Sequence, residues 1–127
     1  MAQREQRVAE HEIQRRWRDY RTMSGHSPVR EFLGGLSEDA RAEIAAVMKD
    51  VQINGLEAAR HLRGEIYEAR ASHDGMAYRV LFATEGQKSR ILLAVEAFEK
   101  KTRRTPPEHI DLALRRLRDW RERGIQE

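Results

Sequence analysis

The 127-residue chain contains no cysteine, only three prolines and few aromatic residues, at 6% of the sequence. Without cysteine, the protein can form neither a disulfide framework nor a catalytic thiolate. The chain also lacks a run of about 18 apolar residues, the length that a membrane-spanning helix needs, and its first residues lack the apolar segment of a secretory signal peptide. We therefore expect a cytoplasmic protein without membrane association.

Charge is abundant in both signs. Lysine and arginine total 24 against 21 acidic residues, the formal net charge is +3, and the pI is about 9.6. Arginine supplies most of the cations, and its planar fork of donors matches the geometry of phosphate. A nucleic-acid or other acidic partner is one interpretation. The small net charge also fits an ordinary surface of mixed charge.

The first third of the chain predicts helices. In residues 4–22, Ile13, Trp17 and Tyr20 recur at helical spacing, although the end of this segment, "WRDYRT", also fits an edge strand. Ser27 followed by proline predicts the start of a short helix over 29–33 that stops at two glycines.

A longer helix follows after Ser37, with acidic residues in its first turn, and Asn54-Gly55 predicts its end. Its expected core-facing residues are Ala40, Ile44, Val47, Met48 and Val51.

Three β-rich runs follow, at 65–71, 77–84 and 90–98, with turn signals "HDG" and "EGQKS" between them. Such short turns predict antiparallel neighbours. Thr105 and Glu108 then form a predicted capping box that begins a C-terminal amphipathic helix. The chain is therefore predicted to be one α+β domain over 1–127. Its N-terminal helices, including a helical extension over 1–26, would pack on a small antiparallel sheet of three to four strands.

Alternation along the second β-rich run separates its side chains into two faces. Tyr78, Val80 and Phe82 form the larger set and suit the core, which places Arg79 with Leu81 and Ala83 on an open face. The neighbouring runs contain Arg70 and Glu96 and are followed by Lys100 and Lys101, so these groups are expected to converge. The alternative is structural: Arg70 and Arg79 would form cross-strand ion pairs with Glu68 and Glu96.

Four motifs in residues 27–121 carry a family resemblance: "SPVREFL", "HLRGEIYEAR", "YRVLFATEG" and "FEKKTRRTPPEHIDLALRR". In this order they resemble the RelE/ParE toxin superfamily, and within it the phage-derived HigB-like branch. The resemblance implies a RelE-like fold and a type II toxin–antitoxin toxin. Such a toxin is a ribosome-dependent mRNA endonuclease that inhibits translation without a metal or cofactor. Its implied partners are the ribosome, mRNA and a HigA-like helix-turn-helix antitoxin.

The same resemblance implies site residues. Arg79 in "AYRVLF" is the first candidate for binding phosphate, and Arg70 in "YEAR" is the second. Lys100 and Lys101 in "FEKKT" are expected to contact phosphate or to donate a proton. Cleavage needs the 2′-hydroxyl deprotonated, the phosphorane charge stabilised and the leaving 5′-oxygen protonated.

One position departs from the family pattern. The branch often has "LHGF" before the lysines, whereas this chain has Glu96 at the histidine position. That glutamate could act as a base or could neutralise a lysine, with His61 and His73 as possible substitutes. His73 is also predicted to contact RNA, together with Arg103 and Arg104. The remaining histidines are expected to be structural or solvated: His11, His26 and His109.

Two other functions stay open. ParE-like members of the superfamily target DNA gyrase and have no nuclease site. The arginine-rich segment 4–21 is also consistent with a non-catalytic phage or host interaction module, because such a helix could dock an antitoxin or contact ribosomal RNA.

Overall fold

The computed structural model describes residues 14–124, which form a sheet and three helices. The strands are β1 (Arg16–Asp19), β2 (Arg60–Arg63), β3 (Ile66–His73), β4 (Met76–Glu85) and β5 (Ile91–Lys100). The helices are α2 (Pro28–Gly34), α3 (Glu38–Asn54) and α4 (Pro107–Glu122), with short 3-10 turns η1 (Gly55–Ala58) and η2 (Gln87–Ser89). None of the helices in this range is long and apolar enough to cross a membrane.

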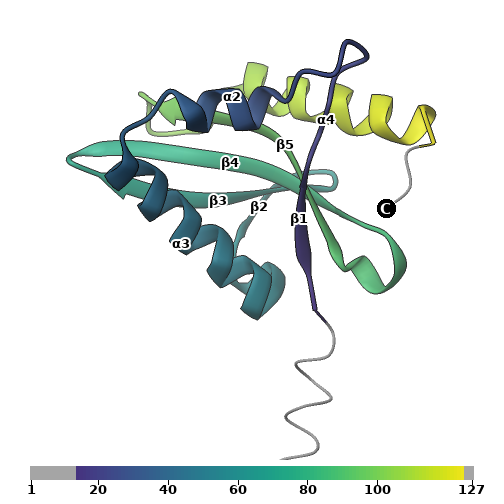
Figure 1. Cartoon of the computed structure of the whole chain (residues 1–127), viewed down its shortest axis with the longest axis horizontal. Coiled ribbons are helices and arrows are strands. Elements are labelled where there is room, and N and C mark those ends of the chain that lie inside the picture. Colours follow the sequence, from purple (N-terminus) through teal and green to yellow (C-terminus); the bar gives the residue numbers. More distant parts are fainter. Residues whose placement is uncertain (1–13, 125–127) are drawn as a thin grey trace, which may run out of the picture.

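The strands form one sheet in the order β1-β5-β4-β3-β2 (Figure 1). The strands β2 to β5 pair antiparallel, whereas β1 pairs parallel with β5 at one edge. The predicted α+β class and the three predicted central strands are confirmed. The sheet has five strands rather than three to four, because β1 and β2 each add a short edge strand.

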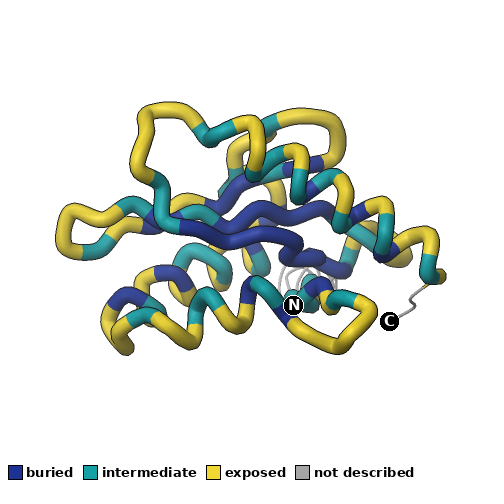
Figure 2. The backbone as a smooth tube through the Cα atoms, turned by 90° about the horizontal axis from the view of Figure 1, so that it is seen from above, coloured by how far each residue is buried: buried dark blue, intermediate teal, exposed yellow. Residues whose placement is uncertain are grey.

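Helices cover both faces of the sheet, and the strands between them contain most of the buried residues (Figure 2). On one face, α2 and α3 pack on a cluster that includes Tyr78, Val80 and Phe82, as predicted. On the other face, α4 buries Leu81 and Ala83. The prediction of an open face was therefore wrong over most of β4, because the amphipathic α4 must also bury its apolar side.

The segment before α2 corrects the predicted N-terminal helix. Residues 16–19 form β1, so the helix prediction is wrong there and the edge-strand interpretation is right; residues 4–13 lie outside the described residues. Trp17 packs edge-on against Phe82 at 5.0 Å between ring centroids, and its indole N–H donates to the Met48 carbonyl at 2.8 Å. Tyr20 lies in the cluster on the opposite face and donates its hydroxyl to Asp119 at 2.6 Å. A spacing of three residues, which suits one face of a helix, places side chains on opposite faces of a strand.

Two of the three predicted helix caps are present. The hydroxyl oxygens of Ser27 and Ser37 accept backbone N–H bonds at the starts of α2 and α3. By contrast, the predicted capping box of α4 is wrong, because Pro106 occupies the capping position and no side chain caps the helix. The Thr105 hydroxyl instead donates to the carboxylate of Glu68 on β3.

Between β3 and β4, the turn has two residues, Asp74 and Gly75, with φ angles of 50° and 78°. Two positive φ angles in a two-residue loop define a type I′ turn, whose twist matches that of the flanking strands. This turn fixes the β3–β4 register, in which Arg70 and Arg79 lie directly opposite each other.

Candidate active site

Arg70 and Arg79 lie at the end of the sheet near the β3–β4 turn. Both residues line a hollow of about 450 Å³, together with Glu43 and Val47 of α3. Arg70 is exposed, whereas the Arg79 side chain is only 11% exposed and donates from Nη1 to the Tyr78 carbonyl at 2.8 Å. The two arginines that the sequence ranked first therefore share one cavity.

Arg79 also lies beside a buried carboxylate. Its Nε is 3.7 Å from Oε1 of Glu68, whose side chain is 1% exposed and also accepts the bond from Thr105. Among residues 14–124, Arg79 Nε is buried without a hydrogen-bond partner. The contact with Glu68 is thus an ion pair without a direct hydrogen bond. The structural interpretation of a cross-strand Arg79–Glu68 pair is confirmed.

Burial lowers the pKa of Arg79, and the nearby charges of Arg70 and Arg60 lower it further, whereas Glu68 opposes the change. Several cations crowd one carboxylate at this point of the sheet. Because positive charges outnumber the single carboxylate here, the position of the Arg79 guanidinium favours the binding of a further anion.

A second hollow, of about 250 Å³, lies along the β2 side of the same region. Arg60, Glu68 and Arg70 line it from the strands, and Val47 and Asp50 line it from α3. Arg60 pairs with Glu68 in the register between β2 and β3. Sequence reasoning did not include Arg60, because the β2 segment was not recognised as a strand.

Lys100, the last residue of β5, is a fourth cation near Arg60, Arg70 and Arg79. Burial lowers its pKa, and the charge of Arg79 lowers it further, as do those of Arg60 and Arg70 to a smaller extent. The lysine ammonium also donates to the carbonyl of Arg103. We call Arg60, Arg70, Arg79 and Lys100 the cationic cluster.

The other predicted cations lie outside this cluster. Lys101 is exposed in the loop after β5, and no contact between its side chain and the cluster is present in the described part of the chain. Arg103 and Arg104 are exposed in the same loop, and their carbonyls accept bonds from Lys100 and Thr102. The RNA contacts predicted for the two arginines remain predictions.

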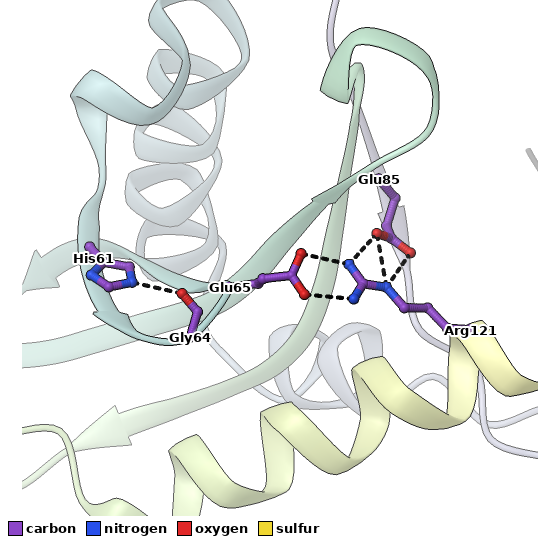
Figure 3. Close-up of polar contacts among 5 residues, drawn as sticks. All are labelled: His61, Gly64, Glu65, Glu85 and Arg121. Carbon is purple, nitrogen blue, oxygen red and sulfur yellow. Dashed lines mark hydrogen bonds and ion pairs between the residues drawn. The ribbon is translucent and has the colours of Figure 1, made fainter.

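The two candidate histidines lie at separate places. His73 ends β3 and lies 3.4 Å from Asp74 in the turn. His61 lies on β2, bonded through Nε2 to the Gly64 carbonyl at 2.7 Å (Figure 3). Neither side chain lines the two hollows.

Glu96 lies under α4, where two other side chains engage its carboxylate. Arg116 Nη1 donates to it at 3.1 Å, and His109 Nδ1 lies 2.8 Å from it. The expectation that Glu96 neutralises a lysine was therefore wrong, because its partners come from α4. His109, which was expected to be structural or solvated, does have a structural contact, but its side chain stays 33% exposed. A histidine thirteen residues away along the chain thus contacts the carboxylate of Glu96.

An arginine near the end of α4 helps to hold that helix on the sheet. Figure 3 shows Arg121 between two carboxylates, those of Glu65 before β3 and Glu85 at the end of β4. Its Nη atoms lie 2.6 and 2.9 Å from the Glu65 oxygens, a two-pronged contact. The bond from Arg121 lowers the pKa of Glu65, and these carboxylates raise the pKa of Arg121. This contact lies away from the cationic cluster and supports the fold.

Two comparisons with known proteins indicate the same family for this chain. Residues 31–118 match the family described as "Phage derived protein Gp49-like (DUF891)". The chain is also 32% identical over 109 residues to a protein named "Probable endoribonuclease HigB1" in two strains of Mycobacterium tuberculosis, CDC 1551 / Oshkosh and ATCC 25618 / H37Rv. That alignment covers 83% of this chain and 84% of the relative. The chain therefore belongs to the phage-derived Gp49-like family, in the HigB-like branch that its four motifs predicted.

Proposed function

We propose that this protein is the toxin of a toxin–antitoxin pair and cleaves mRNA on the ribosome, which inhibits translation. The observation that supports this most directly is the cationic cluster, in which Arg60, Arg70 and Arg79 line two hollows at one end of the sheet and their charges lower the pKa of Lys100. The name of the HigB1 relative supports a ribonuclease. A single toxin domain over residues 1–127, acting in the cytoplasm, is part of the same proposal.

The chemistry of RNA cleavage matches the groups present. When the 2′-oxygen attacks phosphorus, an extra negative charge develops on the phosphorane oxygens, and fixed cations stabilise it. In this proposal guanidinium and ammonium groups stabilise that charge. Arg70 is exposed and able to meet a polymer, whereas Arg79 is held in place by Glu68 and the Tyr78 carbonyl.

The acidic residues nearby restrict where the phosphate would lie. Glu43 and Asp50 line the α3 walls of the two hollows, opposite the arginines. Repulsion from these carboxylates would keep an RNA phosphate against the strand wall, within reach of Arg70 and Arg79. We expect Lys100 and the exposed loop after β5 to extend this contact along the RNA backbone.

An antitoxin is the expected protein partner, and a HigA-like helix-turn-helix protein encoded beside the toxin is the one that the family resemblance implies. Its binding would neutralise the toxin. Co-expression with the product of the neighbouring reading frame should restore growth.

The test is induction of the protein in bacterial cells, followed by measurement of growth and mapping of mRNA 5′ ends. We expect growth arrest and new 5′ ends within translated regions. Arg70→Ala should lower cleavage by about 10- to 100-fold, because one charge-stabilising donor is lost. Arg115→Ala, which removes an exposed arginine of α4 outside the cluster, is the matched control and should cleave normally.

Other outcomes identify other functions. DNA breaks with unchanged mRNA ends would indicate a gyrase-targeting, ParE-like toxin. Unchanged growth and intact nucleic acids, with a protein partner still bound, would indicate a non-catalytic interaction module. Either result would refute the ribonuclease proposal.

A further inference from the structure

His109 lies in the first turn of α4 and is held by a buried carboxylate. Its Nδ1 is 2.8 Å from Oε2 of Glu96, whose side chain is 10% exposed. Arg116 also bonds to Glu96, and to the Val95 carbonyl at 2.8 Å. Because Arg116 already pairs with Glu96, the carboxylate does not depend on His109 alone for a cationic or hydrogen-bonding partner.

The ring of His109 is fixed in orientation by a second contact. It stacks on the ring of Phe98 with 3.7 Å between centroids and 2° between planes. A hydrogen bond at Nδ1 sets the tautomer of a neutral imidazole and leaves a lone pair on Nε2. Among residues 14–124 no hydrogen bond to His109 Nε2 is found, and one third of the side chain is open to solvent.

This ring lies beside the cationic cluster. Phe98 is the β5 partner of Arg79 in the sheet register. Lys100 follows Phe98 by two residues, and side chains two apart in a strand point to the same face, about 7 Å apart along the strand. The chain that leads into α4 is also tied to this region, because Thr105 donates to the Glu68 carboxylate, which is the ion-pair partner of Arg79.

We propose that His109 is the general base of RNA cleavage and that Lys100 is the general acid, with Arg79 stabilising the charge on the phosphorane. This inference rests on the proposed ribonuclease function. His109 Nε2 accepts the proton of the 2′-hydroxyl while the 2′-oxygen forms its bond to phosphorus. The bond between phosphorus and the 5′-oxygen breaks, and the 5′-oxygen takes a proton from the Lys100 ammonium. The products are a 2′,3′-cyclic phosphate and a free 5′-hydroxyl, and proton exchange with water restores both side chains.

Glu96 has a positioning role in this arrangement. Its carboxylate holds the histidine of α4 by Nδ1, at 2.8 Å. A carboxylate that orients an imidazole in this way aims the opposite ring nitrogen at the substrate. Glu96 thus acts through His109, as the residue that orients the base.

The experiment measures cleavage of a short mRNA bound to purified ribosomes, under single-turnover conditions. His109→Asn removes the imidazole but keeps an amide donor near Glu96. We expect the cleavage rate to fall by about 100-fold or more, within the range that general acid–base catalysis contributes. The matched control is His26→Asn, because His26 also lies near a glutamate, Glu31 at 3.2 Å, but in an exposed pair elsewhere.

A second variant separates catalysis from folding. His109→Ala leaves a space above Phe98, and added imidazole should restore part of its cleavage rate, which a purely structural role of the histidine would not allow. The urea midpoints of both variants show whether each is folded in the assay.

The outcomes distinguish the two proposals. If wild type cleaves, Arg70→Ala is impaired and a folded His109→Asn protein cleaves within threefold of wild type, the role of His109 is refuted and the ribonuclease function stands. Failure of imidazole to restore a folded His109→Ala protein also counts against the base. If wild type itself leaves ribosome-bound mRNA intact, the ribonuclease function is refuted and the role of His109 with it.

Discussion

The pairing of Arg79 with Glu68 leads to a quantitative prediction about stability. Arg79→Met removes the cation and keeps an apolar stem of similar length, so the Glu68 carboxylate, 1% exposed, loses its charge partner. Removal of one member of a buried ion pair typically costs about 3–5 kcal/mol. The 3.7 Å separation is long, and Thr105 still donates to the carboxylate. We therefore expect a loss of about 2–3 kcal/mol for this variant.

Glu68→Gln should lessen that loss, because a neutral amide is less costly to bury without a cation. In the double variant, the change in free energy of unfolding should be smaller than the sum of the single changes by about 1–2 kcal/mol. Urea unfolding followed by the fluorescence of Trp17 and Trp120 measures all four proteins. Changes that add to within about 0.5 kcal/mol would show that the two side chains are uncoupled and would refute the reasoning. The result also matters for activity, because a variant at Arg79 that is inactive and unstable says little about catalysis unless Glu68 is changed with it.

Two other predictions concern elements away from the cationic cluster. Arg121→Gln should lower stability by less than about 1 kcal/mol at neutral pH, because the Glu65 side chain is 62% exposed. Arg121 lowers the pKa of Glu65 below its ordinary 4.5. The loss of stability in Arg121→Gln relative to wild type should therefore be complete above pH 4.5 and become smaller as the pH falls below that value. Urea midpoints at several pH values measure this loss, and a loss that stays constant with pH would contradict the reasoning. Gly55→Ala should cost about 1–2 kcal/mol in thermal or urea unfolding, because φ is +75° and the new Cβ would lie 2.7 Å from the Arg15 guanidinium. Gly34→Ala, with nothing within 4 Å of its Cβ, is the control and should be neutral.

The sequence predicted most of the fold, because local signals and global packing agree over most of the chain. The serine caps and the period of α3 identify two helices, and the turn signals around β4 identify the central strands. Of the two short edge strands, β1 was predicted only as an alternative to a helix and β2 was missed, for a physical reason. β1 and β2 have four residues each, and strands of that length depend on pairing with a neighbour rather than on their own pattern.

The candidate site was predicted in part. Motif positions identified Arg70, Arg79 and Lys100, which the fold brings together. Arg60, and His109 as the proposed base, were missed, because each depends on a contact made far along the chain. Arg60 joins the cluster through the pairing of β2 with β3, and His109 reaches Glu96 and Phe98 through the docking of α4 on β5.

Thr105 shows how a correct local signal can be overruled. Its sequence context favours a helix cap, but a buried carboxylate on β3 needs a hydrogen-bond donor more than the first turn of an exposed helix does. No pattern in the sequence near Thr105 indicates that Glu68 will be buried beside it.

The parallel pairing of β1 with β5 has a consequence for the order of folding. β1 is made early during synthesis, yet its register partners, Ile91 to Ala94, are made much later. Its indole bond to α3 and the packing of Tyr20 under α4 likewise join the first strand to elements that follow it. Contacts between distant parts of a chain are slow to form, because closing a long loop costs entropy before any contact compensates for it. A nascent chain would therefore keep the outer edge of its sheet incomplete until β5 and α4 have been made, so the sheet closes only near the end of synthesis.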